Sequence, residues 1–381
     1  METFRQIVND CIRTGLQNNV SSMKQLSKLI YKDTAKYNIV NYYRLCAISK
    51  AAGILANRKK SMQRGHNTRT PYMKKPLLLS CYGFKIIDGV LKVPLGNKQY
   101  FDIQLNNHTK QIIDDPAIKV RSFLLTPNSV SICYSKKVEE YIPKSAIGID
   151  RNLANITVGN SRSLTQYNLA KAVDIAENNR SVMRAFRRCD SRIAKRLWQK
   201  HGQRRRNRVN QLLHKISKII VQQAKQQKAA IVFEDIRHIR GLYLRGNFQG
   251  RDRRFKMNSW PYYELKRQIE YKAAWEGIPV IQLTKCETRG TSKLCPRCGK
   301  TTQVADRIDV QHRRQLWCEK CKRWMDRDVV AAMNIAYRGW SFLAKSKNEF
   351  IHPKGLAGEA MVQESGSEEP VILKVDASKL T

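Results

Sequence analysis

Acidic residues on three segments of the chain lie where an apolar run ends at a loop or where a helix begins. Asp150 ends the apolar run 146–149, and Glu234 follows IVF in the segment AAIVFEDI. Asp326 and Asp328 lie in DRDVVAAMNIA, where helical periodicity begins. Two-metal phosphodiester hydrolysis needs several carboxylates that converge on two Mg²⁺ ions about 3.5–4 Å apart. An acid at such a place is often only a helix cap or part of a solvated turn. The prediction that these acids bind catalytic metal ions therefore depends on their occurring together.

Four cysteines form two matched pairs between the second and third acids. Cys295-x-x-Cys298 and Cys318-x-x-Cys321 have the spacing of a four-cysteine zinc ribbon, and Gly299 suits the tight turn of the first pair. Four thiolates leave no open position on the metal, so we expect a structural Zn²⁺ that takes no part in catalysis. The other cysteines have no such pairing and are interpreted as core or incidental residues: Cys11, Cys46, Cys81, Cys133, Cys189 and Cys286.

Alternating strand and helix patterns surround the first two acids. The segment SAIGIDRNLANITVGN predicts a hairpin with Asp150 at its mouth. Apolar residues at helical spacing from Val209 to Ile220 predict an amphipathic helix, which leads into the strand of Glu234. A second helix ends at Gly277 before the strand-like IPVIQL. We therefore predict an α/β fold for residues 144–290.

The flanking segments differ in character. Apolar spacing from Phe4 predicts helices at the start of the chain, and a loop or domain boundary is expected over 57–75. Short segments rich in β-branched and aromatic residues, separated by turn dipeptides, predict a small antiparallel β domain over 75–137. After Leu343 the composition predicts a largely disordered tail.

The net charge identifies the class of partner. The chain has 71 Lys and Arg against 31 Asp and Glu, a formal charge of +40, spread from the first third to the ribbon. A long polyanion, a nucleic acid, is the expected ligand. No apolar run approaches the ~20 residues of a membrane span, and the first residues lack a secretory pattern. We therefore expect an intracellular protein with reduced thiols, and no membrane partner.

The motifs GIDRN, IVFEDI, TSKLCPRCGK, CEKC and DRDVVAAMNIA, in this order, resemble the transposon-associated TnpB family, which is similar to the type V CRISPR effectors. The resemblance covers 144–340 well and the first 140 residues only in layout. It implies an RNase H-like (RuvC) core with an inserted zinc ribbon, preceded by a helical lobe and a small β-barrel-like wedge domain. The implied host is a prokaryote, with the protein in its cytoplasm or nucleoid.

The resemblance also implies an RNA-guided, Mg²⁺-dependent (or Mn²⁺-dependent) DNA endonuclease that cuts double-stranded DNA beside a short adjacent motif. Its partner would be a guide RNA from the transposon end. The metal-binding acids carried over are Asp150, Glu234 and Asp328, with Asp326 as the fallback. Val330 stands where the family has Asn, which we interpret as loss of a polar group close to the metal site. The chain also begins within the helical lobe, where relatives begin with a wedge strand, so guide and motif recognition are expected to differ most.

The expected domains are a helical lobe (1–70), a β-rich wedge (71–143), a nuclease core in two parts (144–291 and 323–345), a zinc ribbon (292–322) and a disordered tail (346–381). Two basic clusters flank Glu234 and are predicted to contact nucleic acid: Lys195, Arg196, Arg204, Arg205, Arg206 and Arg208 on guide or heteroduplex phosphates, and Arg251, Arg253, Arg254 and Lys256 as a flexible lid. Three tryptophans among basic residues could stack on bases or simply pack: Trp198, Trp317 and Trp324.

Two other functions share these features. A guided repressor that binds RNA and DNA without cutting is disfavoured by the intact acids. A transposase of the same fold would share the acids, and only strand-transfer products would distinguish it. The sequence leaves the oligomeric state open.

Overall fold

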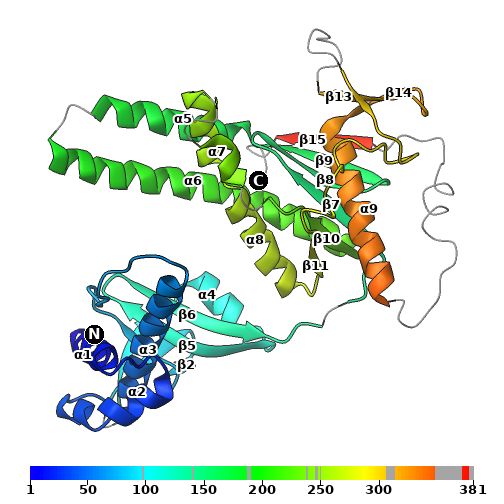
Figure 1. Ribbon diagram of the computed structural model, residues 1–381. Helices are drawn as coiled ribbons and strands as arrows, with labels where there is room; N and C mark the ends of the chain where they lie inside the picture. Colours follow the sequence, from blue (N-terminus) through cyan, green and yellow to red (C-terminus); the bar gives the residue numbers. More distant parts are fainter. Residues whose placement is uncertain are drawn as a thin grey trace. The chain divides into compact units, whose positions relative to one another are not determined.

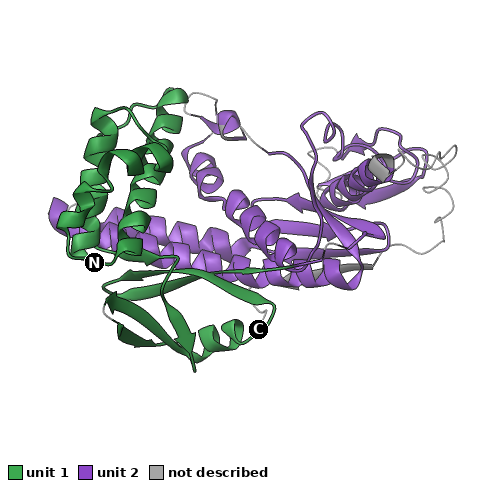
Figure 2. Ribbon diagram, turned by 90° about the horizontal axis from the view of Figure 1, so that it is seen from below, with its two compact units in different colours: residues 1–137 green, residues 138–381 purple. Residues whose placement is uncertain are grey.

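The computed structural model describes residues 1–96, 98–139, 141–186, 190–236, 239–244, 248, 250–305, 314–347 and 371–376. The chain divides into two compact units, Met1–Lys137 and Val138–Thr381 (Figure 2). Each unit has its own apolar core. The predicted helical lobe and β-rich wedge are therefore parts of one unit, which ends a few residues before the expected boundary at 143.

Helices form the first half of unit 1, as predicted. They are α1 (Glu2–Gln17), α2 (Met23–Ile30), the short 3₁₀ helix η1 (Asp33–Lys36) and α3 (Asn41–Gln63). Ser22 caps α2, because its side chain accepts a hydrogen bond from the backbone N–H of Gln25 at 3.3 Å. The third helix extends seven residues into the predicted loop, which begins only after Gln63.

The second half of unit 1 contains two antiparallel sheets. One has the order β1-β5-β6 and the other β2-β3-β4, and both pack on the helices through one core. The predicted barrel is not confirmed: in the part of this unit that the structure describes, no strand pairing joins the two sheets. Helix α4 (Asn107–Ile113) lies between β4 and β5 in the sequence. The strand bounds are β1 (Leu78–Ser80), β2 (Lys85–Ile87), β3 (Val90–Gly96), β4 (Gln99–Gln104), β5 (Ile118–Thr126) and β6 (Ser129–Lys136).

A six-stranded mixed sheet is the centre of unit 2, in the order β11-β10-β7-β8-β9-β15. The predicted hairpin is its middle: β7 (Ser145–Arg151) pairs antiparallel with β8 (Asn155–Gly159), which pairs antiparallel with β9 (Ser163–Asn168). On the other side, β10 (Ala229–Phe233) runs parallel to both β7 and β11 (Val280–Gln282). The apolar sequence of β10 is buried throughout, as expected for a strand covered on both faces.

Helices cover the two faces of this sheet (Figure 1). One face packs on α5 (Ala170–Ala185), α6 (Ser191–Gln226) and α8 (Tyr262–Trp275) through Ile147, Ile149 and their neighbours. The buried residues of α6 from Val209 onward are the predicted amphipathic face, but the helix is 36 residues long and includes the basic stretch before it. The opposite face packs on α9 (Arg327–Lys347) through Ala146, Val232 and Ile335.

Two glycines let α9 lie directly on the sheet. A Cβ at Gly148 of β7 would lie 2.1 Å from the carbonyl oxygen of Ala332, and one at Gly339 would lie 2.3 Å from a methyl group of Val232. The contact at Gly148 is with helix backbone, which cannot move aside as a side chain can. This approach fixes the height of α9 above β7, and hence the place of the helix start.

We predict that Gly148→Ala destabilises the protein by about 1–3 kcal/mol or more, because the added methyl group overpacks the α9 contact. Guanidinium denaturation of the purified protein measures the change. Gly202→Ala in α6 is the matched control, because a Cβ there meets nothing within 4 Å. That control should gain roughly 0.5–1 kcal/mol from helix propensity. Equal midpoints for Gly148→Ala and the unchanged chain would contradict the close approach.

The remaining elements of unit 2 lie at its edges. The ribbon is a small antiparallel sheet of β12 (Gln303–Val304), β13 (Gln315–Cys318) and β14 (Arg323–Asp326). After β10 come a 3₁₀ helix, η3 (Ile239–Tyr243), and α7 (Arg251–Ser259). In the predicted disordered tail, Val371–Asp376 is instead a strand, β15, parallel to β9. Its run of apolar and β-branched residues suits a strand that adds to an open sheet edge. The rest of the tail, from residue 348, lies outside the described residues.

Candidate active site

The three predicted acids lie on the face of the sheet that α9 covers. Side chains alternate along a strand, so Asp150 shares the face of Gly148, and Glu234 shares that of Val232. Asp328 is in the first turn of α9, which crosses this face. The parallel pairing of β7 with β10, with Ile149 opposite Phe233, places the first two acids at neighbouring strand ends.

The charges of the other two acids act on Asp150. Burial is the main cause that raises the pKa of Asp150 to about 8, and the charges of Glu234 and Asp328 raise it further. Burial also raises the pKa of Glu234, against the opposing effect of Arg151. Ionising all of these buried carboxylates costs a large free energy unless cations lie between them. Perturbed acids of this kind mark candidate functional sites.

Amides and arginines that the sequence did not single out hold these acids. Asn152 Nδ2 donates to Asp150 Oδ2 at 2.7 Å, and Asn155 Nδ2 donates to Asp328 Oδ2 at 3.0 Å. Arg314, just before β13, donates to both oxygens of Asp328 at 2.9 and 3.1 Å. Residues 155 and 328 are 173 positions apart, so no sequence spacing could have indicated this contact.

Arg151 is a second unexpected member of the site. It is 3% exposed, and its guanidinium donates to the carbonyl oxygens of Glu234 at 2.7 Å and Tyr262 at 3.3 Å. It also lies over the Phe233 ring, 5.1 Å from its centre. Arg151 therefore ties the end of β10 and the start of α8 to β7. A charged residue directly after Asp150 in a buried strand was the only sequence signal.

Asp326 has a different local role from Asp328. Its Oδ1 accepts hydrogen bonds from the backbone N–H groups of Asp328 at 2.8 Å and Val329 at 3.1 Å. This is an N-cap for α9. Asp326 therefore holds the helix start, while Asp328 faces the other acids.

The residues of this site fit divalent cations, which prefer oxygen ligands. Besides the acids, two buried oxygens, Asn155 Oδ1 and Thr157 Oγ1, have no hydrogen-bond partner in the part of the chain that the structure describes. Thr157 lies directly opposite Asp150 in the β7–β8 pairing. Among the described residues, the potential metal ligands with all ligand atoms within 4.8 Å of one another are cysteines, so the three acids are more widely spaced.

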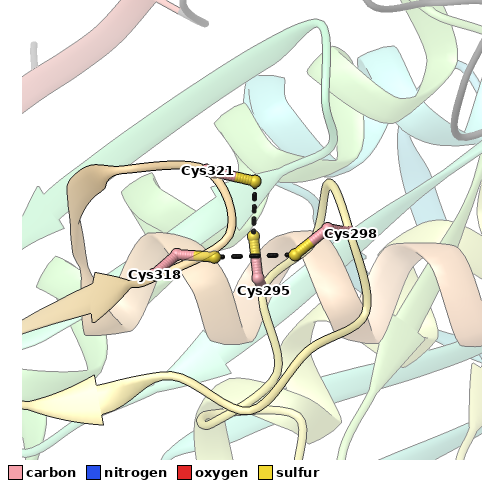
Figure 3. Close-up of side chains that lie close together, drawn as sticks. All are labelled: Cys295, Cys298, Cys318 and Cys321. Carbon is pink, nitrogen blue, oxygen red and sulfur yellow. Dashed lines mark hydrogen bonds between the residues drawn. The ribbon is translucent and has the colours of Figure 1, made fainter.

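The four ribbon cysteines form a compact cluster (Figure 3). Their sulfurs all lie within 4.8 Å of one another, with Cys295 to Cys321 at 3.8 Å and Cys298 to Cys318 at 3.5 Å. A tetrahedral zinc with Zn–S bonds of ~2.3 Å needs sulfurs about 3.8 Å apart. The predicted cysteines are thus brought together with a geometry that can hold zinc.

The thiols of this cluster differ in acidity. Burial opposes ionisation of Cys318, but hydrogen bonds from the backbone N–H of Cys321 and from the neighbouring thiols lower its pKa to about 7. Burial and the same neighbours raise the pKa of Cys321 to about 12. One thiolate is therefore available near neutral pH, and metal binding would displace the remaining protons.

The ribbon is joined tightly to α9. The side chain of Asn334 donates to the carbonyl oxygens of Thr291 at 2.7 Å and Leu294 at 2.8 Å. Val330 is completely buried in the ribbon core with Cys295 and Cys318. The interpretation of Val330 as a lost polar group beside the acids is therefore wrong: two residues along a helix turn the side chain by about 200°, so Val330 points away from the side of α9 that carries Asp328.

We predict that Val330→Asn lowers stability by about 1–3 kcal/mol, because it buries an amide in an apolar cluster. It should not increase nuclease activity. Thermal unfolding of the zinc-loaded protein measures the loss, with Phe342→Asn as the control because Phe342 is 51% exposed on the same helix. A higher cleavage rate in Val330→Asn would contradict the assignment of this position to the ribbon core.

Basic residues cover the N-terminal half of α6. Between Ser191 and Arg208, Ala194 is buried and most other side chains are exposed. Trp198 is 49% exposed among them, whereas Trp317 and Trp324 pack against each other across β13 and β14 with ring centres 5.3 Å apart.

The segment that was expected to be a flexible lid is the helix α7 instead. This helix is held to α5 by two ion pairs, Arg180–Asp252 at 2.7 Å and Lys256–Glu177 at 2.9 Å.

No helix among the described residues is long and apolar enough to cross a membrane.

Residues 262–335 match the family model described as "Cas12f1-like, TNB domain". That range contains all four ribbon cysteines and Asp328. The chain is 28% identical over 267 residues to the TnpB-like protein MJ0751 of Methanocaldococcus jannaschii, an alignment that covers 66% of this chain and 91% of that protein. The predicted resemblance to the TnpB family is confirmed.

Beyond this TnpB-like relative, two Cas12f1 CRISPR-associated endodeoxyribonucleases share shorter segments. The one from Sulfoacidibacillus thermotolerans is 34% identical over 124 residues, and the one from an uncultured archaeon is 32% identical over 82 residues. These alignments span 25% and 14% of the two Cas12f1 proteins. Among solved structures, the mini-RNA-guided endonuclease CRISPR-Cas_phi3 matches with a TM-score of 0.34 and 11% identity, over 67% of this chain and 57% of that one.

Proposed function

We propose that this protein is an RNA-guided DNA endonuclease that cuts double-stranded DNA beside a short adjacent motif, with an RNase H-like (RuvC-type) two-metal site. The observation that carries the proposal is the meeting of Asp150, Glu234 and Asp328 on one buried face. The names of the TnpB-like and Cas12f1 relatives support the same reaction class. The strand order, with an antiparallel hairpin beside two parallel strands, is compatible with this core.

The three acids would hold the catalytic Mg²⁺ or Mn²⁺ ions. Bound there, such ions activate a water and stabilise the leaving oxygen of the phosphodiester. Asn152 orients Asp150, and Arg151 fixes the chain at Glu234 through its carbonyl oxygen. Arg314 pairs with Asp328 while its own side chain is 62% exposed, so it is placed to contact a phosphate of the DNA strand.

The ribbon would hold one structural Zn²⁺ through Cys295, Cys298, Cys318 and Cys321. It would also set the start of α9, because β14 runs directly into that helix. The basic half of α6 would contact phosphates of the guide RNA or of its heteroduplex with DNA, where base pairing supplies sequence specificity. The basic residues of α7 would guide a single strand towards the acids.

The deciding experiment combines the protein with RNA transcribed from its own locus and with plasmids that carry a matching target beside randomised flanks. Mg²⁺-dependent cleavage that requires both the guide and a particular flank would support the proposal. Specific DNA binding without cutting would indicate a guided repressor, and joined strand-transfer products would indicate a transposase. Cleavage that ignores the guide would rule out RNA guidance.

We predict that replacing Arg204, Arg206 and Arg208 by Gln weakens nucleic-acid binding and flattens its salt dependence. If each contacts one phosphate, the slope of log affinity against log salt should fall by about 2–3 in magnitude. Filter binding at several salt concentrations measures both quantities. Lys225→Gln is the control, because this residue lies at the far end of α6 and pairs with Glu276 at 2.5 Å. The same slope in both variants would remove α6 from the interface.

A further inference from the structure

The amide of Asn155 contacts one of the acids, Asp328. Asn155 is the first residue of β8, and Ile156 and Val158 point into the core on the other face of the sheet. Asn155 and Thr157 therefore lie on the α9 face, with Thr157 directly opposite Asp150. The side chain of Asn155 thus shares the surface on which the acids meet.

The two ends of this amide have different surroundings. Nδ2 donates to Asp328 Oδ2 at 3.0 Å, which connects the hairpin to the start of α9. Oδ1 is buried and has no partner among the described residues, and the same holds for Thr157 Oγ1. An unsatisfied buried oxygen costs about 1–3 kcal/mol, so two of them beside a cluster of acids require a reason.

Turn formation does not supply that reason. The turn between β7 and β8 closes through backbone atoms, with Asn152 N–H donating to the carbonyl oxygen of Asn155 at 2.9 Å. Any residue type at position 155 keeps this bond. The side chain of Asn160, at the other end of β8, shows the contrast: its Nδ2 donates to Ala146 O at 3.2 Å, and its Oδ1 accepts from the backbone N–H groups of Arg162 and Ser163.

We propose that Asn155 is a positioning residue of the cation site: its Nδ2 holds Asp328 in place, and its Oδ1 accepts hydrogen bonds from the water that a bound divalent cation carries. Mg²⁺ usually keeps several of its waters in proteins, and each needs an acceptor. The amide suits this task because it can donate to a carboxylate and accept from water at once, whereas another carboxylate could only accept. This inference rests on the proposed function, since it requires cations at the acids.

The test uses the full chain, loaded with zinc, in chelator-free buffer without nucleic acid. Thermal unfolding is followed as MgCl₂ is added, and the Mg²⁺ concentration that gives half of the stabilisation is recorded. Mg²⁺ is the probe because it prefers oxygen over thiolate ligands. For Asn155→Leu, which has similar volume but no amide, this midpoint should rise about 10–100-fold, as is usual when a supporting partner of a metal ligand is lost.

A matched pair of substitutions separates positioning from simple packing. Asn155→Asp adds a negative charge beside Asp328, so it should unfold at a lower temperature without Mg²⁺ and gain more than the unchanged chain when Mg²⁺ is added. Asn160→Asp makes the same chemical change in the satisfied asparagine of the next turn. It should lose stability equally with and without Mg²⁺. Asn155→Asp also serves if Asn155→Leu does not fold.

The outcomes separate this inference from the function beneath it. If Asp150→Asn removes the Mg²⁺ stabilisation but Asn155→Leu has a midpoint within twofold of the unchanged chain, the role of Asn155 is refuted and the cation site stands. The same conclusion follows if Asn155→Asp gains no more from Mg²⁺ than Asn160→Asp. If Asp150→Asn keeps the full Mg²⁺ stabilisation, the cation site itself fails, and the proposed function with it.

Discussion

Replacing Asp150 by Asn should lower guided DNA cleavage by roughly 10³-fold or more, because a lost metal ligand removes several kcal/mol of transition-state stabilisation. Cleavage of a matched plasmid at saturating Mg²⁺ measures the effect. Asp326→Asn is the matched control: Asn caps helices as well as Asp does, so α9 should keep its start and cleavage should change little. If the two variants lose activity equally, Asp326 is a metal ligand too.

The same substitution should stabilise the metal-free protein at alkaline pH. The pKa of Asp150 is raised from its ordinary value of 3.8 to about 8, so the folded chain holds a proton that the unfolded chain has released. The stabilising contribution of this group is therefore complete below about pH 4 and is lost as pH rises through about 8. Asn does not titrate. The unfolding temperature of Asp150→Asn relative to the unchanged chain should thus increase from pH 6 to pH 9 without Mg²⁺, and a constant difference would contradict the burial of a charged Asp150.

Replacing Cys318 by Ser should abolish cleavage by a different route. Structural zinc sites contribute about 10–16 kcal/mol of apparent binding free energy in small modules, so a ribbon without its metal should not stay folded. Asp328 follows the last ribbon strand by two residues, and Val330 packs in the ribbon core. Loss of the ribbon should therefore displace the third acid. The zinc content should fall from one ion per chain to none, and a protease should cut within 292–322.

The stability of the two variants distinguishes the loss of cleavage in Cys318→Ser from that in Asp150→Asn. Cys318→Ser should unfold at a lower temperature, whereas Asp150→Asn should not. Cys286→Ser is the control, since Cys286 is an exposed cysteine outside the cluster, and it should retain both zinc and activity. Full cleavage by zinc-free Cys318→Ser would show that α9 keeps its position without the ribbon.

Local chemistry made part of this structure predictable from sequence. Two Cys-x-x-Cys pairs have few other uses, and Asp150 and Glu234 follow short continuous apolar runs of the kind that buried strands have. The helix of α6 was predictable from Val209 onward because its apolar face is periodic. The helical form of α7 could not be predicted, because its sequence, with four basic residues, has no periodic apolar face. Ion pairs to α5 hold this helix in place instead.

Contacts between distant segments were beyond the reach of the sequence. Arg314 and Asn155 reach Asp328 only once the ribbon and the sheet have folded. Val330 was misplaced because the interpretation depended on the Asn that the family has at this position, close to Asp328, whereas the helix turns this side chain into the ribbon core. The common core of segments 1–70 and 71–143 could not be predicted, because a shared apolar core leaves no mark on either segment alone.

During synthesis, β9 leaves the ribosome long before the strand that pairs with its edge. Strand β15 follows about 200 residues later, which takes roughly 10–40 s at 5–20 residues per second. Over that interval the backbone groups of 163–168 on that side have no strand to pair with, and open edges of this kind pair with other chains. Soluble yield should therefore depend on how quickly residues 371–376 are made. A fusion partner added after residue 381 would lie next to the strand that closes this edge, and it would affect the pairing of β15 with β9 more directly than the acids.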